Sequence, residues 1–164
     1  MSTLLPSHID IAEPARKKLV KLLNLALADT LDIQLQIKQA HWNVRGHDFI
    51  AVHELLDKIE EDVEEGADVV AERISQLGGT AEGTAQQIVA KTRVPEYPLG
   101  IHDSTRHLEA LTKALAKFAN GVRKAIDEAD DLGDKDAADI FTQVSRAADK
   151  NLWFIESHLY RKTV

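Results

Sequence analysis

The positions of the helix-breaking residues constrain the fold of this chain more than any other feature. The chain has four prolines and eight glycines in 164 residues, and its last proline is Pro98, so the final third is free to form long helices. A longer stretch, 80–101, carries Pro95, Pro98 and two glycines. Shorter groups of turn-forming residues lie at 43–46, 78–79 and 131–133. These breaks divide the chain into four long segments and one irregular one.

Apolar residues recur every three or four positions in the long segments, which is the period of a helix that is buried along one side. The second segment shows this most clearly, with Val52, Leu56, Ile59, Val63, Ala67, Val70, Ile74 and Leu77. Pro14 suits a first helical turn, and Asp103 and Ser104 are favourable N-caps. We predict long helices at about 13–44, 48–77, 103–130 and 135–160, and a short helix at about 84–91.

The lengths of the connections predict how these helices are arranged. A short connection makes consecutive helices antiparallel neighbours, whereas the connection of roughly 25 residues after the second helix can run the length of a bundle. The sequence therefore predicts an all-α fold. It should be a ferritin-like four-helix bundle in which a long crossover between helices two and three carries the short extra helix. A chain of 164 residues suits one such domain, 1–164, better than two.

The net charge of −7 disfavours nucleic acid as a default partner, because neutralising phosphate requires exposed Lys and Arg. An acidic chain suits metal cations better. The absence of cysteine excludes disulfides and thiolate ligands. The N-terminus does not resemble a secretory signal, and no apolar run approaches the length of a membrane span. We therefore expect a cytoplasmic protein.

Five potential metal ligands follow a spacing that a single helix cannot bring to one point. His53 and Asp57 share a helix face, as do Asp68 and Glu72, and His41 lies just upstream. The eleven residues from Asp57 to Asp68 return to nearly the same face but span roughly 16 Å, too far for one cluster. Either each pair serves its own site, or an antiparallel second copy brings the pairs together across a two-fold axis. Imidazoles and carboxylates without sulfur suit iron, manganese or zinc.

Spacing alone leaves other interpretations of these residues open. Asp68 and Glu72 lie on an acid-rich helix and can belong to a solvated face, and histidines beside apolar neighbours are often hydrogen-bonded core residues. The run HELLD at 53–57 is one residue away from the H-E-x-x-H pattern of zinc hydrolases. The Glu-x-x-His motif of larger ferritins is absent from the sequence.

Three runs of the sequence, together with Asp57, Asp68 and Ala71-Glu72-Arg73, resemble a known family. The runs are KQAHWNVRG at 38–46, FIAVHE at 49–54 and LWFIES at 152–157. They are similar to the signature of the Dps family, mini-ferritins named for DNA-binding proteins from starved cells. The resemblance implies a hollow dodecamer with a ferroxidase centre at each dimer interface. There His41, His53 and Asp57 of one chain would meet Asp68 and Glu72 of its partner. It further implies Fe(II) as substrate, hydrogen peroxide as preferred oxidant and storage of ferric mineral. Zinc can compete with iron, because the same ligand types suit both metals.

Two further sets of residues have roles suggested by their position. Trp42, beside His41, can intercept stray oxidising equivalents, but such a tryptophan more often packs, and we favour packing. By resemblance, the junction of helices three and four lines three-fold pores in which carboxylates would concentrate iron, although a charge run is commonly a solvated surface. The candidate pore residues are Asp127, Asp130, Asp131, Asp134 and Asp136.

The ends of the chain depart from the family pattern. Many Dps proteins bind DNA through a lysine-rich N-terminal tail, but residues 1–15 contain no Lys or Arg, and the C-terminus offers only Arg161 and Lys162. An acidic assembly without a basic arm should repel duplex phosphate. We therefore expect iron and peroxide detoxification. The alternative is a nucleoid-associated, DNA-protecting protein whose main role is DNA binding.

Overall fold

Helices account for all the regular structure in the computed structural model, which describes residues 3–160. Apart from one isolated bridge between Arg45 and Asp103, these residues form no β-structure. Arg161 and Lys162 lie outside the described range. The helices are α1 (Glu13–Asn43), α2 (Phe49–Gln76), α3 (Ala85–Lys91), α4 (Ser104–Asp131) and α5 (Lys135–Leu159). The all-α prediction is confirmed.

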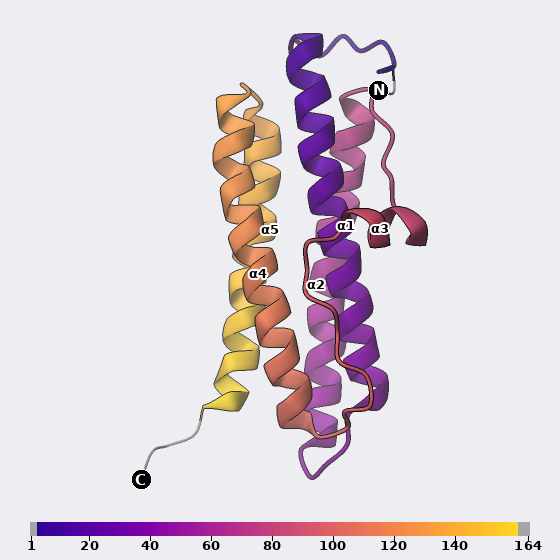
Figure 1. Ribbon diagram of the computed structural model, residues 1–164. Helices are drawn as coiled ribbons and strands as arrows, with labels where there is room; N and C mark the ends of the chain where they lie inside the picture. The colour runs from indigo at the N-terminus through magenta and orange to yellow at the C-terminus, as the bar shows by residue number, and fades with distance from the viewer. Residues whose placement is uncertain (1–2, 161–164) are drawn as a thin grey trace.

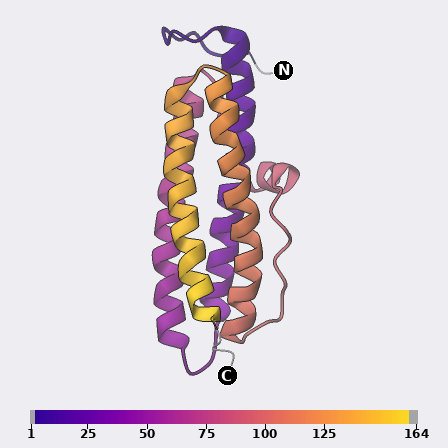
Figure 2. The ribbon, with the colours of Figure 1, turned by 90° about the vertical axis from the view of Figure 1, so that its left-hand side faces the viewer.

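The four long helices form two antiparallel hairpins, α1 with α2 and α4 with α5, that lie side by side (Figure 1). The segment between α2 and α4 returns along the outside of α1 to the end of the bundle where α4 begins. Figure 2 shows α3 standing outside the four long helices. The predicted ferritin-like topology with a long crossover is confirmed, and each predicted helix boundary lies within about two residues of the observed one.

Local chemistry explains where these helices begin and end. Gly78 follows α2 with φ +81°, and Gly133 follows α4 with φ +82°, conformations that residues with a Cβ rarely adopt. The carboxylate of Asp103 accepts a hydrogen bond from the Arg106 N–H at 3.2 Å, so Asp103 is the N-cap of α4, as predicted. Asp134 caps α5 in the same way through the Ala137 N–H.

The core lies between the two hairpins and contains the apolar stripe predicted on α2, every member of which is buried. Leucines 19 and 23 of α1 meet it from one side, and Leu111, Leu115 and Phe141 of the second hairpin meet it from the other. Burial of these faces is the main stabilising contribution to such a bundle. Within residues 3–160, no helix combines the length and the apolar character needed to span a membrane.

Polar side chains on one side of α1 hold the crossover in place. Asn24 donates to the Thr80 carbonyl at 3.0 Å and accepts from the Glu82 N–H at 2.9 Å. The buried carboxylate of Asp29 accepts three hydrogen bonds from Arg93, at 2.6–3.0 Å. Asp32 accepts from the Thr92 hydroxyl at 2.6 Å. The long segment is therefore fixed along α1, and this fixes where α4 begins.

Candidate metal centre

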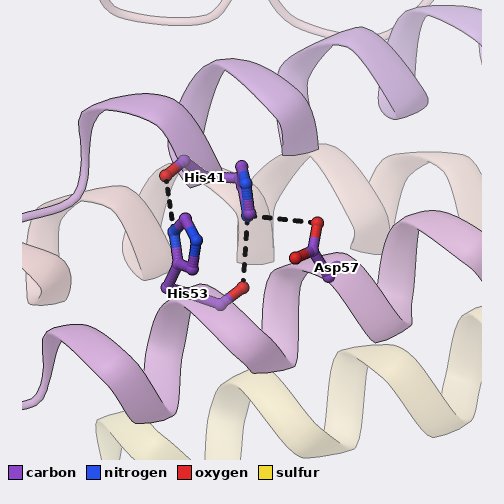
Figure 3. Close-up of side chains that lie close together, drawn as sticks. All are labelled: His41, His53 and Asp57. Carbon is purple, nitrogen blue, oxygen red and sulfur yellow. Dashed lines mark hydrogen bonds and ion pairs between the residues drawn. The ribbon is translucent and has the colours of Figure 1, made fainter.

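His41, His53 and Asp57 converge at the closed end of the first hairpin, and each offers a ligand atom within 4.8 Å of the others (Figure 3). His41 comes from the last turn of α1, and His53 and Asp57 from the first turns of α2. The short connection between the two helices turns the chain back on itself, which places the histidines opposite each other. This is the only such group of three potential ligands within residues 3–160.

The two imidazoles hold each other in place through the backbone. His41 Nδ1 lies 3.2 Å from the His53 carbonyl oxygen, His53 Nδ1 lies 3.1 Å from the His41 carbonyl oxygen, and the rings stack at 3.7 Å. A carbonyl oxygen can only accept, so each Nδ1 carries a proton, and in the neutral imidazole Nε2 is the nitrogen that offers a lone pair to a metal. Fixing the tautomer in this way is how proteins prepare histidines to bind a metal.

Asp57 completes the group and is already paired with a cation. Its Oδ1 lies 3.2 Å from His41 Nδ1 and 3.3 Å from the ammonium of Lys38, which also contacts Glu60 at 3.0 Å. Gln34 donates to the other oxygen of Glu60 at 2.8 Å. The pKa of Lys38 lies above its ordinary value, chiefly because of the hydrogen bond to Glu60, with a smaller contribution from Asp57 and an opposing one from burial. Lys38 is therefore charged and competes for Asp57 with any incoming metal.

Removal of this ammonium should strengthen metal binding. We expect Lys38→Met to bind Zn(II) about fivefold more tightly, because a partly exposed ion pair contributes up to about 1 kcal/mol. Calorimetric titration of the full-length protein with Zn(II) measures the change. Lys58→Met is the matched control, since Lys58 is an exposed lysine of α2 that lies over the Phe154 ring. Equal or weaker binding by Lys38→Met would show that Lys38 does not compete for Asp57.

Asp68 and Glu72 lie apart from this group. Both side chains are exposed on α2. Asp68, the nearer of the two, lies roughly 16 Å from Asp57 along the helix axis. Asp68 lines an open groove between α1, α2 and the start of the crossover, together with Leu27, Leu31, Gln34, Glu61, Glu64 and Glu65. One chain thus brings together three of the five predicted ligands and leaves two carboxylates facing outwards.

Known proteins share this fold and a large part of this sequence. A family model described as a ferritin-like domain matches residues 20–162. The DNA protection during starvation protein of Agrobacterium fabrum is 45% identical over 154 residues, which cover 94% of this chain and 95% of that protein. The chain belongs to the Dps group of the ferritin-like family. DpsA14 from Streptomyces coelicolor has a TM-score of 0.92 at 36% identity, over 98% of this chain and 96% of that one. DpsC from the same organism has a TM-score of 0.93 at 29% identity, over 99% and 95%.

Trp42 does not occupy the core of this Dps chain. Its side chain is 62% exposed. Two apolar side chains nearby in the sequence are exposed to a similar extent, Leu35 at 57% and Ile50 at 60%. Trp42 therefore does not pack into the core of its own chain, and packing against another copy stays a prediction. On α1, Leu35 follows the half-buried Leu31 by four residues and Trp42 follows Leu35 by seven, so these three residues share one face of the helix.

The predicted pore residues of this Dps chain divide into two kinds. Asp127, Asp130, Asp131 and Asp136 are exposed around the junction of α4 and α5, and Asp130 pairs with Lys135. Asp134 is only 1% exposed, and its two oxygens accept from Arg73 Nη2 at 2.6 Å and Nε at 3.2 Å. Because it also caps α5, Asp134 has no free oxygen for a passing cation, and we withdraw it from the pore set. The sequence already indicated this role, because an aspartate between Gly133 and the start of the next helix is in the position of an N-cap.

Proposed function

We propose that this Dps-family chain oxidises Fe(II) at a site shared between two copies and stores the ferric product in a hollow dodecamer. The observation that carries the proposal is the split ligand set. His41, His53 and Asp57 form a prepared but incomplete group, while Asp68 and Glu72 are exposed about three turns along the same helix. If a second copy of α2 lies antiparallel to the first, its two carboxylates would reach the three ligands of the first chain. The carboxylates of the first chain would reach the three ligands of the second, which gives two equivalent sites.

The surface around the site supports a second copy as the partner. The exposed apolar side chains of Leu35, Trp42 and Ile50 lie on the hairpin that carries the ligands, and contact with another copy would remove them from water. The acidic residues of α2, including Glu61 and Glu65, would come close to their own symmetry mates. Bound cations would offset that repulsion, so iron and assembly should support each other.

Iron is the substrate in this reaction, and hydrogen peroxide is the proposed oxidant. The two Nε2 lone pairs and the three carboxylates suit ferrous ions, and they suit zinc well enough for it to compete. Reduction of peroxide to water takes two electrons, and two Fe(II) ions supply one each. Pairwise oxidation breaks the O–O bond without releasing a hydroxyl radical. We propose that iron reaches the interior past Asp127, Asp130, Asp131 and Asp136, where carboxylates raise the local cation concentration.

The Agrobacterium fabrum relative is named for DNA protection. In this chain, protection of DNA would follow from the removal of iron and peroxide. The chain carries a formal net charge of −7, and residues 1–15 contain neither Lys nor Arg. Such a surface repels duplex phosphate, so contact with DNA is not the main role that we propose. The cytoplasm, where both Fe(II) and peroxide arise, is the proposed location.

Stoichiometry tests the proposed reaction directly. We expect anaerobic protein loaded with Fe(II) to oxidise about two ferrous ions for each peroxide added, with no hydroxyl radical captured by a spin trap. Zn(II) added first should slow the reaction, because it binds the same imidazoles. Oxidation of one Fe(II) per peroxide, with trapped radical in proportion, would contradict paired oxidation. A rate no greater than that of Fe(II) in buffer would contradict a ferroxidase.

A further inference from the structure

A tyrosine and a histidine form a short, sheltered hydrogen bond that the proposed metal centre does not use. Tyr97 lies in the crossover after α3, and His107 lies in the first turn of α4. The Tyr97 hydroxyl oxygen is 2.6 Å from His107 Nδ1. His107 is 1% exposed, and Tyr97 is partly buried against the core. The other tyrosine of the chain, Tyr160, is 80% exposed.

The protonation of this pair follows from its surroundings. Burial raises the pKa of the Tyr97 phenol far above its ordinary value, so the phenol keeps its proton. Burial also lowers the pKa of His107, opposed by the nearby carbonyls of Asn43 and Ile101 and the carboxylate of Asp103. The imidazole is therefore neutral. The phenol donates to Nδ1, which leaves the His107 proton on Nε2, a buried atom without a hydrogen-bond acceptor in good geometry.

The pair lies at the same end of the bundle as the metal centre. The Asn43 carbonyl beside the His107 ring is only two residues from His41. The loop after α1 is joined to the start of α4, since the Arg45 N–H donates to the His102 carbonyl at 2.8 Å and Ser104 donates to Asp48 at 2.8 Å. Figure 1 shows these ends meeting where the crossover finishes. The imidazole that accepts the hydrogen bond from Tyr97 thus lies beside the backbone of Asn43, two residues from the ligand His41.

We propose that Tyr97 is a one-electron donor to the ferroxidase site and that His107 accepts its phenolic proton. The proposal rests on the ferroxidase function proposed above. A partly buried phenol that lost an electron alone would leave a positive charge that water can solvate only in part. Movement of the proton across the 2.6 Å hydrogen bond removes that charge from the ring as the electron leaves. The neutral His107 imidazole is the base that receives the phenolic proton, so the proton moves only across this hydrogen bond.

The pair would act when only one Fe(II) meets peroxide. That reaction yields Fe(III), hydroxide and a hydroxyl radical. Tyr97 gives the radical one electron, which converts it to hydroxide, while the phenolic O–H bond breaks and its proton moves to His107 Nδ1. A second Fe(II) later returns an electron to the tyrosyl radical, and the proton returns from Nδ1 to the phenolic oxygen. In total, two Fe(II) and one peroxide are consumed, as in paired oxidation, and the pair is regenerated.

Electron paramagnetic resonance of freeze-quenched samples tests this role, because the chain has only two tyrosines. Full-length protein carrying less than one Fe(II) per site is mixed with peroxide and frozen. We expect a tyrosyl radical in the wild type and in Tyr160→Phe, and none in Tyr97→Phe, which should release more spin-trapped hydroxyl radical. His107→Gln can still accept the hydrogen bond but not the proton, so its tyrosyl signal should be weaker even though circular dichroism shows an unchanged helix content.

The outcomes separate the two proposals. If the wild type oxidises Fe(II) with peroxide but gives no tyrosyl signal, or if Tyr97→Phe keeps that signal, the role of Tyr97 is wrong and the ferroxidase stands. An unchanged signal in His107→Gln would overturn the role of His107 as proton acceptor. If the wild type oxidises Fe(II) no faster than buffer does, the ferroxidase proposal itself fails. A purely structural hydrogen bond would hold the crossover without giving a radical.

Discussion

Subunit exchange between His53→Ala and Asp68→Ala proteins should restore about a quarter of the wild-type ferroxidase sites, although each protein is inactive alone. In a shared site, His53 comes from one chain and Asp68 from the other. A mixed dimer therefore holds one site that lacks both residues and one that is complete. Random exchange makes half of the dimers mixed, so one site in four is intact. The initial rate of Fe(II) oxidation by peroxide measures the recovery.

A second mixture is the matched control. His53→Ala and Asp57→Ala remove ligands from the same half of the site, so a mixed dimer has a damaged half at each of its two sites. That mixture should stay inactive under the same exchange conditions. Mass spectrometry of the assemblies confirms that mixed dimers have formed. If both mixtures recover, or if neither does while mixed dimers are present, the ligands are not divided between chains in the way we propose.

Asp134→Ala should lower the free energy of unfolding by about 3–5 kcal/mol, the largest single effect that we expect on stability. Asp134 is 1% exposed and Arg73 is 5% exposed, so the substitution removes the bidentate partner of a buried guanidinium. Arg73 keeps only the Gln76 side chain at 3.1 Å and the exposed Asp136 at 3.5 Å. It also removes the N-cap of α5, where the carboxylate accepts from the Ala137 N–H at 3.0 Å. Urea unfolding at a fixed protein concentration measures the loss, because assembly adds to the apparent stability.

The chain offers a close control for this ion pair. Arg123 and Asp149 form an ion pair in which one guanidinium nitrogen, Nη2, contacts both carboxylate oxygens at 2.7 and 2.6 Å, and both side chains are about half exposed. Asp149→Ala should therefore cost about 0–1 kcal/mol, since water can solvate the remaining guanidinium. Arg73→Met combined with Asp134→Ser should cost less than the two single losses added together, because no charge is left unpaired. Similar losses for Asp134→Ala and Asp149→Ala would show that burial does not set the strength of the pair.

The helices and their order were predictable because their signals are local. The breaks at Gly78 and Gly133, the cap at Asp103 and the apolar period of α2 act within a few residues of each other in the chain. The contacts that fix the crossover were not predictable in this way. Asn24, Asp29 and their partners are 56 to 64 residues apart, so nothing near them in the sequence identifies the acceptor or donor that each will find.

The same distinction applies to the metal centre. His41, His53 and Asp57 were predicted as ligands and lie together, because the loop between α1 and α2 is short enough to fix their register. Lys38 was overlooked, although it lies one helical turn before His41 and so on the same side of α1. Asp134 was misjudged as one member of an acidic run. Its partner Arg73 is 61 residues away, and only the fold shows that one carboxylate of that run is buried.

The ion pair between Lys38 and Asp57 has a consequence for which ions the site can take up. The ammonium is tethered to α1, so it faces Asp57 at a high effective concentration whatever the salt in solution. A potassium or sodium ion brings the same single charge without the tether and gains nothing by replacing it. A divalent ion brings twice the charge and bonds to two imidazoles as well. The proposed site would therefore select ions by valence, and binding a divalent metal would replace the Lys38 ammonium beside Asp57 with another cation.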